Sequence, residues 1–172
     1  MLAEVIKWGG FVKLSHTVSA LPFAIAAMVV AARENHGWPG WPLFLVIVGA
    51  VVAARTCAMA FNRLVDRHFD KENPRTAGRH LPTGQISVPS AWTLCILSAA
   101  GFVVITWFIN RVCFYLSPVA LFIVCFYSLT KRFTDFTHIY LGVALACPPL
   151  GAWLAVQGTI HIAALILALA VV

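Results

Sequence analysis

The sequence predicts an all-α membrane protein, a multi-pass bundle of transmembrane helices. Of the 172 residues, 61% are hydrophobic and only 10% are charged, and the apolar residues form long runs separated by short polar connections. Soluble domains carry about 25% charged residues, so this composition lies well outside their range. A helix of about 20 apolar residues crosses about 30 Å of hydrocarbon and satisfies its own backbone hydrogen bonds. We expect a single integral membrane domain over residues 1–172.

Five charge-poor segments are each long enough to cross a bilayer. Near the first, Glu4, Lys7 and Lys13 interrupt the apolar region, so we predict a retained helix and no cleaved signal peptide. The second ends in a stretch of acidic and basic residues. Only Asn110 and Arg111 separate the third from the fourth, and the fifth ends at a Gln-Gly turn. The five predicted spans are 12–32, 42–61, 89–109, 112–130 and 139–157.

A sixth apolar segment starts near Thr159 and stops at Val172. Its length of about 14 residues is too short to cross a bilayer unaided. We therefore expect the chain to be the N-terminal part of a longer protein. A half-helix that ends within the membrane, or one covered by a partner, remains an alternative.

The basic residues predict an orientation. Nine of them fall on one side of the predicted bundle, and only Arg33 and Arg111 fall on the other, with Arg55 inside the membrane. The positive-inside rule then places the N-terminus and the loop after the second span in the cytoplasm, which for a bacterial protein makes the membrane the inner (plasma) membrane. The net charge of +6 follows from this topology and not from nucleic-acid binding. The nine residues are Lys7, Lys13, Arg63, Arg67, Lys71, Arg75, Arg79, Lys131 and Arg132.

A ridge of oxygen-bearing side chains is predicted at the end of the second span. Asn62, Asp66 and Asp70 are four residues apart, so each lies about 40° from the one before on a helix and all three share a face. Amide and carboxylate oxygens are ligands that Mg²⁺ prefers, and Mg²⁺ usually completes its coordination with phosphate oxygens. We expect a magnesium and diphosphate site at a membrane surface. Arg63, Arg67 and His68 are expected to point away, toward lipid headgroups.

Cations follow the ridge closely enough to bind the same phosphates. Lys71, Arg75 and Arg79 continue the sequence, and Pro74 is expected to end the helix so that the arginines lie on a turn. A solvated helix end that carries Asp and Arg only for solubility is the alternative interpretation.

Arg55 is a second indication of an anion site. It lies seven residues before Asn62, about 20° away around the helix and deeper in the apolar region, where a charge is costly and usually faces a polar cavity. Packing against a backbone carbonyl is the alternative for Arg55. The five cysteines form no CxxC pair and are interpreted as small buried hydrophobic residues.

The stretch NRLVDRHFDKENPRTAGRHLPTG resembles the first aspartate-rich motif and following loop of the UbiA superfamily of intramembrane prenyltransferases. Tyr127 and Lys131 in YSLTK resemble the Y-x3-K element of that family, and KLSH…LPFA from Lys13 to Ala24 is similar to the first helix of its hydroxybenzoate-type members. His80 stands where the family usually has proline, a change associated with the bacterial quinone branch.

The resemblance implies nine transmembrane helices around a cavity, with two aspartate-rich motifs that bind Mg²⁺ and a polyprenyl diphosphate. It assigns Asn62, Asp66 and Asp70 to the metal and Arg75, Arg79, Tyr127 and Lys131 to the diphosphate, with Lys71 beside them. Asp135 is the last carboxylate side chain, so we expect the second motif beyond Val172 and expect this chain alone to be inactive.

The expected reaction is Mg²⁺-dependent transfer of a polyprenyl group to a hydroxylated aromatic acid such as 4-hydroxybenzoate, in ubiquinone or menaquinone biosynthesis. Arg55 is the candidate for the acceptor carboxylate, and Lys13 and His16 on the first helix are further candidates, although a hydrogen-bonded structural role for His16 remains open. The alternatives are another acceptor in the same family, above all a dihydroxynaphthoate, and a transporter with an interfacial charged site.

Overall fold

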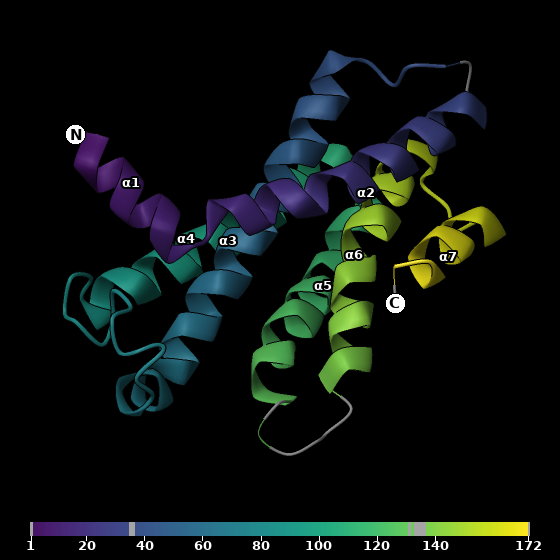
Figure 1. Cartoon of the computed structure of the whole chain (residues 1–172). Coiled ribbons are helices and arrows are strands. Elements are labelled where there is room, and N and C mark those ends of the chain that lie inside the picture. Colours follow the sequence, from purple (N-terminus) through teal and green to yellow (C-terminus); the bar gives the residue numbers. More distant parts are fainter. Residues whose placement is uncertain (1, 35–36, 131, 133–136, 172) are drawn as a thin grey trace.

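The computed structural model describes residues 2–34, 37–130, 132 and 137–171, and within them the only regular secondary structure is helical (Figure 1). The predicted all-α class is therefore confirmed. The seven helices are α1 Leu2–Phe11, α2 Leu14–Glu34, α3 Trp41–Glu72, α4 Val88–Ile109, α5 Arg111–Thr130, α6 Thr137–Gln157 and α7 Ile162–Leu169.

Four of the described helices, α3 to α6, are long and apolar enough to cross a membrane. They correspond to the last four of the five predicted spans, and the chain is a multi-pass membrane protein. The first predicted span, 12–32, corresponds to α2, in which the apolar stretch found among the described residues is Ala20–Arg33, and a break at Val12 and Lys13 separates α2 from α1. Lys13 adopts a left-handed backbone conformation with φ of 48°, which an α-helix does not accommodate.

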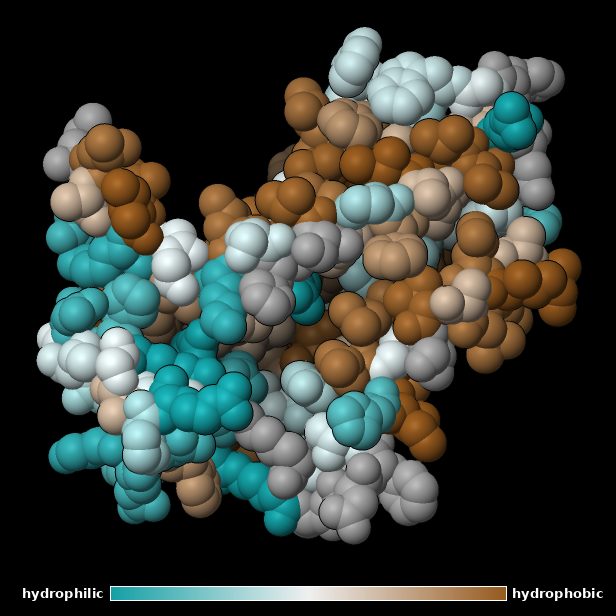
Figure 2. Space-filling view, in the orientation of Figure 1, coloured by the Kyte–Doolittle hydropathy of each residue, from teal (hydrophilic) through white to brown (hydrophobic). Residues whose placement is uncertain are grey.

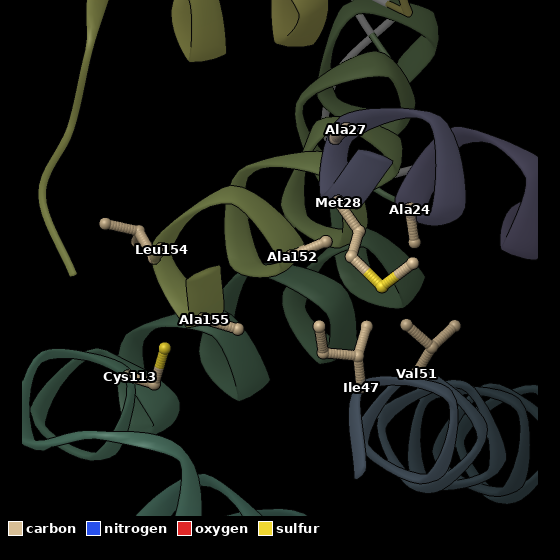
Figure 3. Close-up of a cluster of buried hydrophobic side chains, with 9 residues drawn as sticks. All are labelled: Ala24, Ala27, Met28, Ile47, Val51, Cys113, Ala152, Leu154 and Ala155. Atoms are coloured by element: carbon tan, nitrogen blue, oxygen red, sulfur yellow. The ribbon is translucent and has the colours of Figure 1, made fainter. Parts of the chain in front are cut away.

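Helix α3 occupies the middle of the bundle. It packs along α4 and also contacts α2, α5 and α6, while α5 and α6 run side by side (Figure 1). Small side chains allow these helices to approach closely, as is common between membrane helices. One core cluster joins α2, α3, α5 and α6 (Figure 3). It consists of Ala24, Ala27, Met28, Ile47, Val51, Cys113, Ala152, Leu154 and Ala155.

A second core cluster lies nearer the polar end of α3. Cys57 there contacts Cys95 of α4 and Cys125 of α5, with sulfur–sulfur distances of 3.8 and 3.9 Å. All five cysteines lie within the described residues and are free thiols, and Cys57, Cys95 and Cys113 are buried. The interpretation of these three as buried hydrophobic residues agrees with the structure.

The polar ends of several elements meet at one end of the bundle. Phe11 of α1 packs edge to face against His80 of the α3–α4 connection, with ring centroids 6.2 Å apart. Arg132, just after α5, donates a hydrogen bond to the Val65 carbonyl of α3 at 2.8 Å. Figure 2 shows hydrophilic residues gathered around the α3–α4 connection and hydrophobic residues over α2 and α7. The structure thus brings together α1, the motif loop and the end of α5, as the charge pattern predicts.

The side chain of Asn110, at the junction between α4 and α5, forms hydrogen bonds with both α5 and α6. Its side-chain oxygen accepts a hydrogen bond from the Cys113 backbone N–H, and its amide donates to the Leu154 carbonyl, both at 2.8 Å. One side chain therefore caps the start of α5 and holds a neighbouring helix.

We expect Asn110→Ala to lower the free energy of unfolding by about 1–2 kcal/mol, because it removes both the cap and the link to α6. Asn110→Ser is the matched control, since its hydroxyl keeps the cap but is too short to reach Leu154, and its loss should be about half as large. Thermal unfolding in detergent measures both variants. Equal stability of wild type and Asn110→Ala would contradict the role of this side chain.

Candidate functional site

A cavity of about 680 Å³ lies between α3, α4, α5 and α6, and residues beside and on α7 complete its wall. Most of the wall is apolar, with side chains such as Phe102, Ile109 and Leu145. Polar side chains gather where α3 leaves the apolar core. Thr106 and Ser117 also line the wall, but their hydroxyls donate to carbonyls of their own helices. The other wall residues with hydroxyl, amide or charged side chains are Arg55, Asn62, Asp66, Arg79, Tyr127 and Ser128.

The predicted ridge on α3 is only partly directed into this cavity. Asn62 and Asp66, one turn apart, line the wall, and the Asn62 amide donates a hydrogen bond to Ser128 Oγ of α5 at 3.2 Å. Asp70 is just as buried as Asp66, each being 6% exposed, but it is not a wall residue. The reason is the drift of about 40° per step, which turns the third member of the series away from the first.

Asp70 is held by two arginines. Arg79 Nη1 donates to Asp70 Oδ1 at 2.6 Å, and Arg63 Nη1 lies 4.0 Å from Asp70 Oδ2. Arg63 is only 7% exposed, so the expectation that it faces lipid headgroups is wrong. The signal was present in the spacing, because residues seven apart on a helix differ by only about 20° and Arg63 therefore shares the face of Asp70. His68, by contrast, is exposed as expected.

The loop after α3 returns Arg79 to the end of that helix. Helix α3 stops at Glu72, and Asn73 takes an extended conformation before Pro74, as a residue before proline usually does. Thr76 Oγ1 then donates to the Asp70 carbonyl at 3.0 Å, and the Arg79 N–H donates to the Thr76 carbonyl at 3.0 Å. The predicted helix end and arginine-bearing turn are both present.

Of the three cations predicted to follow the ridge, one in the last turn of α3 and two in the loop, one reaches the cavity. Arg79 is a wall residue, whereas Lys71 and Arg75 are exposed and lie outside the wall. The Arg75 backbone N–H bonds to Asn73 Oδ1 at 3.0 Å, which directs this part of the loop to the surface. Spacing along the chain could not distinguish these cations, because the path of the loop decides which of them turns inward.

The end of α5 supplies further groups. Tyr127 lines the cavity as predicted, while Lys131 lies outside the described residues. Arg132 was used only to predict topology, yet its Nη2 lies 3.8 Å from Asp66 Oδ1 and its guanidinium stands 5.0 Å from the centre of the Phe69 ring. Arg132 is therefore a site residue that sequence reasoning missed.

Of the residues proposed for an aromatic acceptor, Arg55 lies on the cavity wall. Lys13 is exposed at the break between α1 and α2 and is not a wall residue. His16 belongs to α2, but its side chain lies outside the described part of the structure, so its role stays a prediction.

The donor set at the polar end of the cavity fits a hard divalent cation. Asn62 and Asp66 contribute an amide and a carboxylate on one wall, and phosphate oxygens commonly complete such a shell. Asp70 is not a wall residue, and its carboxylate accepts a hydrogen bond from Arg79. Within the described residues no three His, Cys, Asp or Glu side chains gather as a metal site, so a metal bound here would need ligands from elsewhere.

Comparison with known proteins connects this geometry with one family. The model of the UbiA prenyltransferase family matches residues 20–172. The chain is 37% identical over 137 residues to the 4-hydroxybenzoate octaprenyltransferase of Methylobacillus flagellatus, covering 79% of this chain and 46% of the relative. It is 36% identical over 132 residues to the protoheme IX farnesyltransferase of Shewanella sediminis, covering 75% of this chain and 43% of the relative.

A solved structure has the same fold. The apo structure of a UbiA homolog from Aeropyrum pernix K1 matches with a TM-score of 0.78 and 28% identity, covering 90% of this chain and 55% of that one. The chain thus spans about half the length of the curated relatives it matches.

The hydrogen bond from Asn62 to Ser128 is expected to hold the Asn62 amide on the cavity wall. Ser128→Ala should lower the free energy of unfolding by about 1 kcal/mol, because it leaves this amide without its acceptor. Ser117→Ala is the control, since that equally buried hydroxyl bonds only to the Phe114 carbonyl of its own helix. A thermal shift no larger for Ser128→Ala than for Ser117→Ala would show that the bond between helices contributes nothing.

Proposed function

We propose, from the premise that this chain belongs to the UbiA prenyltransferase family, that the whole protein transfers a polyprenyl group from a polyprenyl diphosphate to a hydroxylated aromatic acid such as 4-hydroxybenzoate. The reaction would serve ubiquinone or menaquinone biosynthesis. The observation that carries the proposal is an apolar cavity whose polar end combines acidic and basic side chains, Asp66 and Arg79. Relatives that are 4-hydroxybenzoate octaprenyltransferases support the acceptor class.

The two ends of the cavity suit the two parts of the donor. An anionic diphosphate would bind at the polar end, where Arg79 and Tyr127 lie on the wall, and an isoprenoid chain would pack along the apolar walls of α4 to α6. Those walls would also keep water away from C1 of the prenyl group, where it would otherwise compete with the aromatic ring for the allylic carbon.

Asn62 and Asp66 would hold Mg²⁺. The bound ion would supply charge neutralisation for the diphosphate and so assist its departure. Asp70, which the sequence pattern also assigns to the metal, bonds instead to Arg79 in this structure.

The cations of this chain would stabilise the negative charge that grows on the departing diphosphate. Arg79 is the best placed, and Lys131 remains a proposal from the sequence pattern. Lys71 and Arg75 lie outside the cavity wall and would act at the surface, where they could attract the anionic headgroup of the donor.

Arg55 is proposed to bind the carboxylate of the acceptor. It lies on the same wall as Asn62 but about 10 Å further along α3, at a rise of about 1.5 Å per residue. This separation would place an aromatic acid beside the reacting end of the donor. The exposed Lys13 has no such position.

Transfer of a farnesyl group to protoheme is the second candidate function, because a protoheme farnesyltransferase matches this chain at 36% identity, close to the 37% of a 4-hydroxybenzoate octaprenyltransferase. A dihydroxynaphthoate is a third acceptor that the sequence leaves open. Mass spectrometry of the products formed by the whole protein with 4-hydroxybenzoate, dihydroxynaphthoate and protoheme would choose among them. We further propose that the protein lies in the inner (plasma) membrane with the motif loop in the cytoplasm, since the clustered arginines and lysines lie at that end.

Asp66→Asn in the whole protein should lower kcat/KM for Mg²⁺-dependent prenyl transfer by about a hundredfold or more, because it removes a charged metal ligand. Glu72→Gln is the matched control, as it removes the same charge from an exposed position near the end of α3. Radiolabelled prenyl transfer measures both. Near-normal turnover by Asp66→Asn would exclude the metal-binding role.

Arg55→Ala should raise KM for the aromatic acid by about tenfold while changing KM for the prenyl diphosphate by less than about threefold. The reason is that Arg55 lies away from the Asp66 and Arg79 end of the cavity. Steady-state kinetics with each substrate varied in turn would measure the difference, and Arg111→Ala, an exposed arginine at the start of α5, serves as the control. Equal increases in the two KM values would place Arg55 at the diphosphate instead.

A further inference from the structure

Three charged side chains form a cluster behind the polar end of the cavity. Asp70 lies between Arg79, which it contacts at 2.6 Å, and Arg63, whose Nη1 is 4.0 Å from its other oxygen. The side chains of Arg63 and Asp70 are 8% and 9% exposed, whereas that of Arg79 is 32% exposed. Of the three, only Arg79 lines the cavity.

Stability alone does not explain why these buried charged side chains are present. Removing a guanidinium and a carboxylate from water is costly, and apolar residues of similar size often stabilise a fold as well or better. Two arginines and one aspartate leave a net charge of +1 in the cluster, so the positive charge is fixed beside the cavity. This arrangement favours an anion bound at the wall.

The geometry assigns distinct tasks to the three residues. A short, charge-assisted hydrogen bond fixes the direction of a guanidinium, and the Thr76 bond to the Asp70 carbonyl fixes the backbone of the same turn. Arg63 approaches the second carboxylate oxygen from its own helix, α3. The Asp70 carboxylate is thereby held on both sides.

We propose that Asp70, supported by Arg63, is a positioning residue that orients Arg79 toward the diphosphate of the donor. This inference rests on the proposed function, since it concerns the diphosphate end of the same site. In this role Asp70 acts without a metal. Arg63, which is not part of the N-x3-D-x3-D pattern, acts by supporting Asp70.

The affinity for inorganic pyrophosphate, measured in EDTA so that no metal is bound, distinguishes a positioning role of Asp70 from that of a metal ligand. The two roles predict opposite effects of Asp70→Asn on this affinity. If Asp70 acted only through a metal, Asp70→Asn would leave metal-free binding unchanged or strengthen it, because it removes a negative charge near an anion. If Asp70 orients Arg79, the same variant should weaken binding about tenfold or more, as Arg79→Gln does. Isothermal titration of the purified whole protein in detergent measures Kd.

Arg63 is tested in a double-mutant cycle. Arg63→Gln should weaken pyrophosphate binding in the wild-type background but have little further effect when Arg79 is already Gln, because its influence passes through Arg79. A purely electrostatic contribution of Arg63 would instead weaken binding equally in both backgrounds and would overturn the positioning role. Arg67→Gln is the matched control, since Arg67 removes the same charge from α3 but bonds to the Leu64 carbonyl outside the cluster.

Size-exclusion chromatography would show whether Asp70→Asn folds. If it does not, Asp70→Glu is used to test the positioning role in its place. The longer side chain preserves the charge but displaces the carboxylate, so weaker pyrophosphate binding would support positioning, and unchanged binding would refute it. Failure of the wild-type whole protein to bind pyrophosphate both in EDTA and with Mg²⁺ would refute the diphosphate site itself, and with it the proposed function, whereas failure in EDTA alone would refute only the metal-independent positioning role. Normal binding by both wild type and Asp70→Asn would refute only the positioning role.

Discussion

The ion pair between Asp70 and Arg79 joins the last turn of α3 to the loop that follows it, and the polar end of the cavity depends on this contact. A charged group near hydrocarbon is tolerated when it is paired or faces a polar cavity. Here both conditions hold, because Asp70 is paired behind the wall and Arg79 lies on it. Arg79 is thus the cation of the motif loop that both pairs with Asp70 and lines the cavity in the described part of the chain.

The long helix α3 makes this arrangement possible. It is 32 residues long, so one rigid element carries the apolar core, Arg55, and the Asn62 to Asp70 series. Its neighbours α4 and α5 pack against the same helix and supply the opposite walls. Arg55 and Asp66 lie on one helix, which fixes their separation. The distance between the proposed acceptor and donor ends of the cavity is therefore fixed as well.

Much of the fold and part of the site follow from the sequence for identifiable reasons. Apolar runs of sufficient length predicted α3 to α6, and Pro74 predicted the end of α3 to within two residues. The break at Lys13 was missed, because a left-handed backbone in a run of ordinary residues carries no strong sequence signal. Helical spacing puts Asn62 and Asp66 on the face of α3 that lines the cavity. It also puts Arg63 on the face of Asp70, a signal that the prediction for Arg63 overlooked. The contact of Arg132 with Asp66 depends on the path of the chain after α5 and is not determined by spacing.

The proposed contact of Arg55 with the acceptor carboxylate does not discriminate among the candidate rings. A guanidinium binds a carboxylate or a phosphate through the same two-pronged geometry, so its contact with an acceptor carboxylate carries no information on the ring to which the carboxylate is attached. Hydroxybenzoate, dihydroxynaphthoate and protoheme all carry carboxylates, so one arginine could serve each of them. Discrimination among the rings must then come from the shape of the apolar wall, where exchanging one hydrophobic side chain for another changes affinity only modestly. This agrees with the similar identity of the chain to relatives that act on 4-hydroxybenzoate and on protoheme.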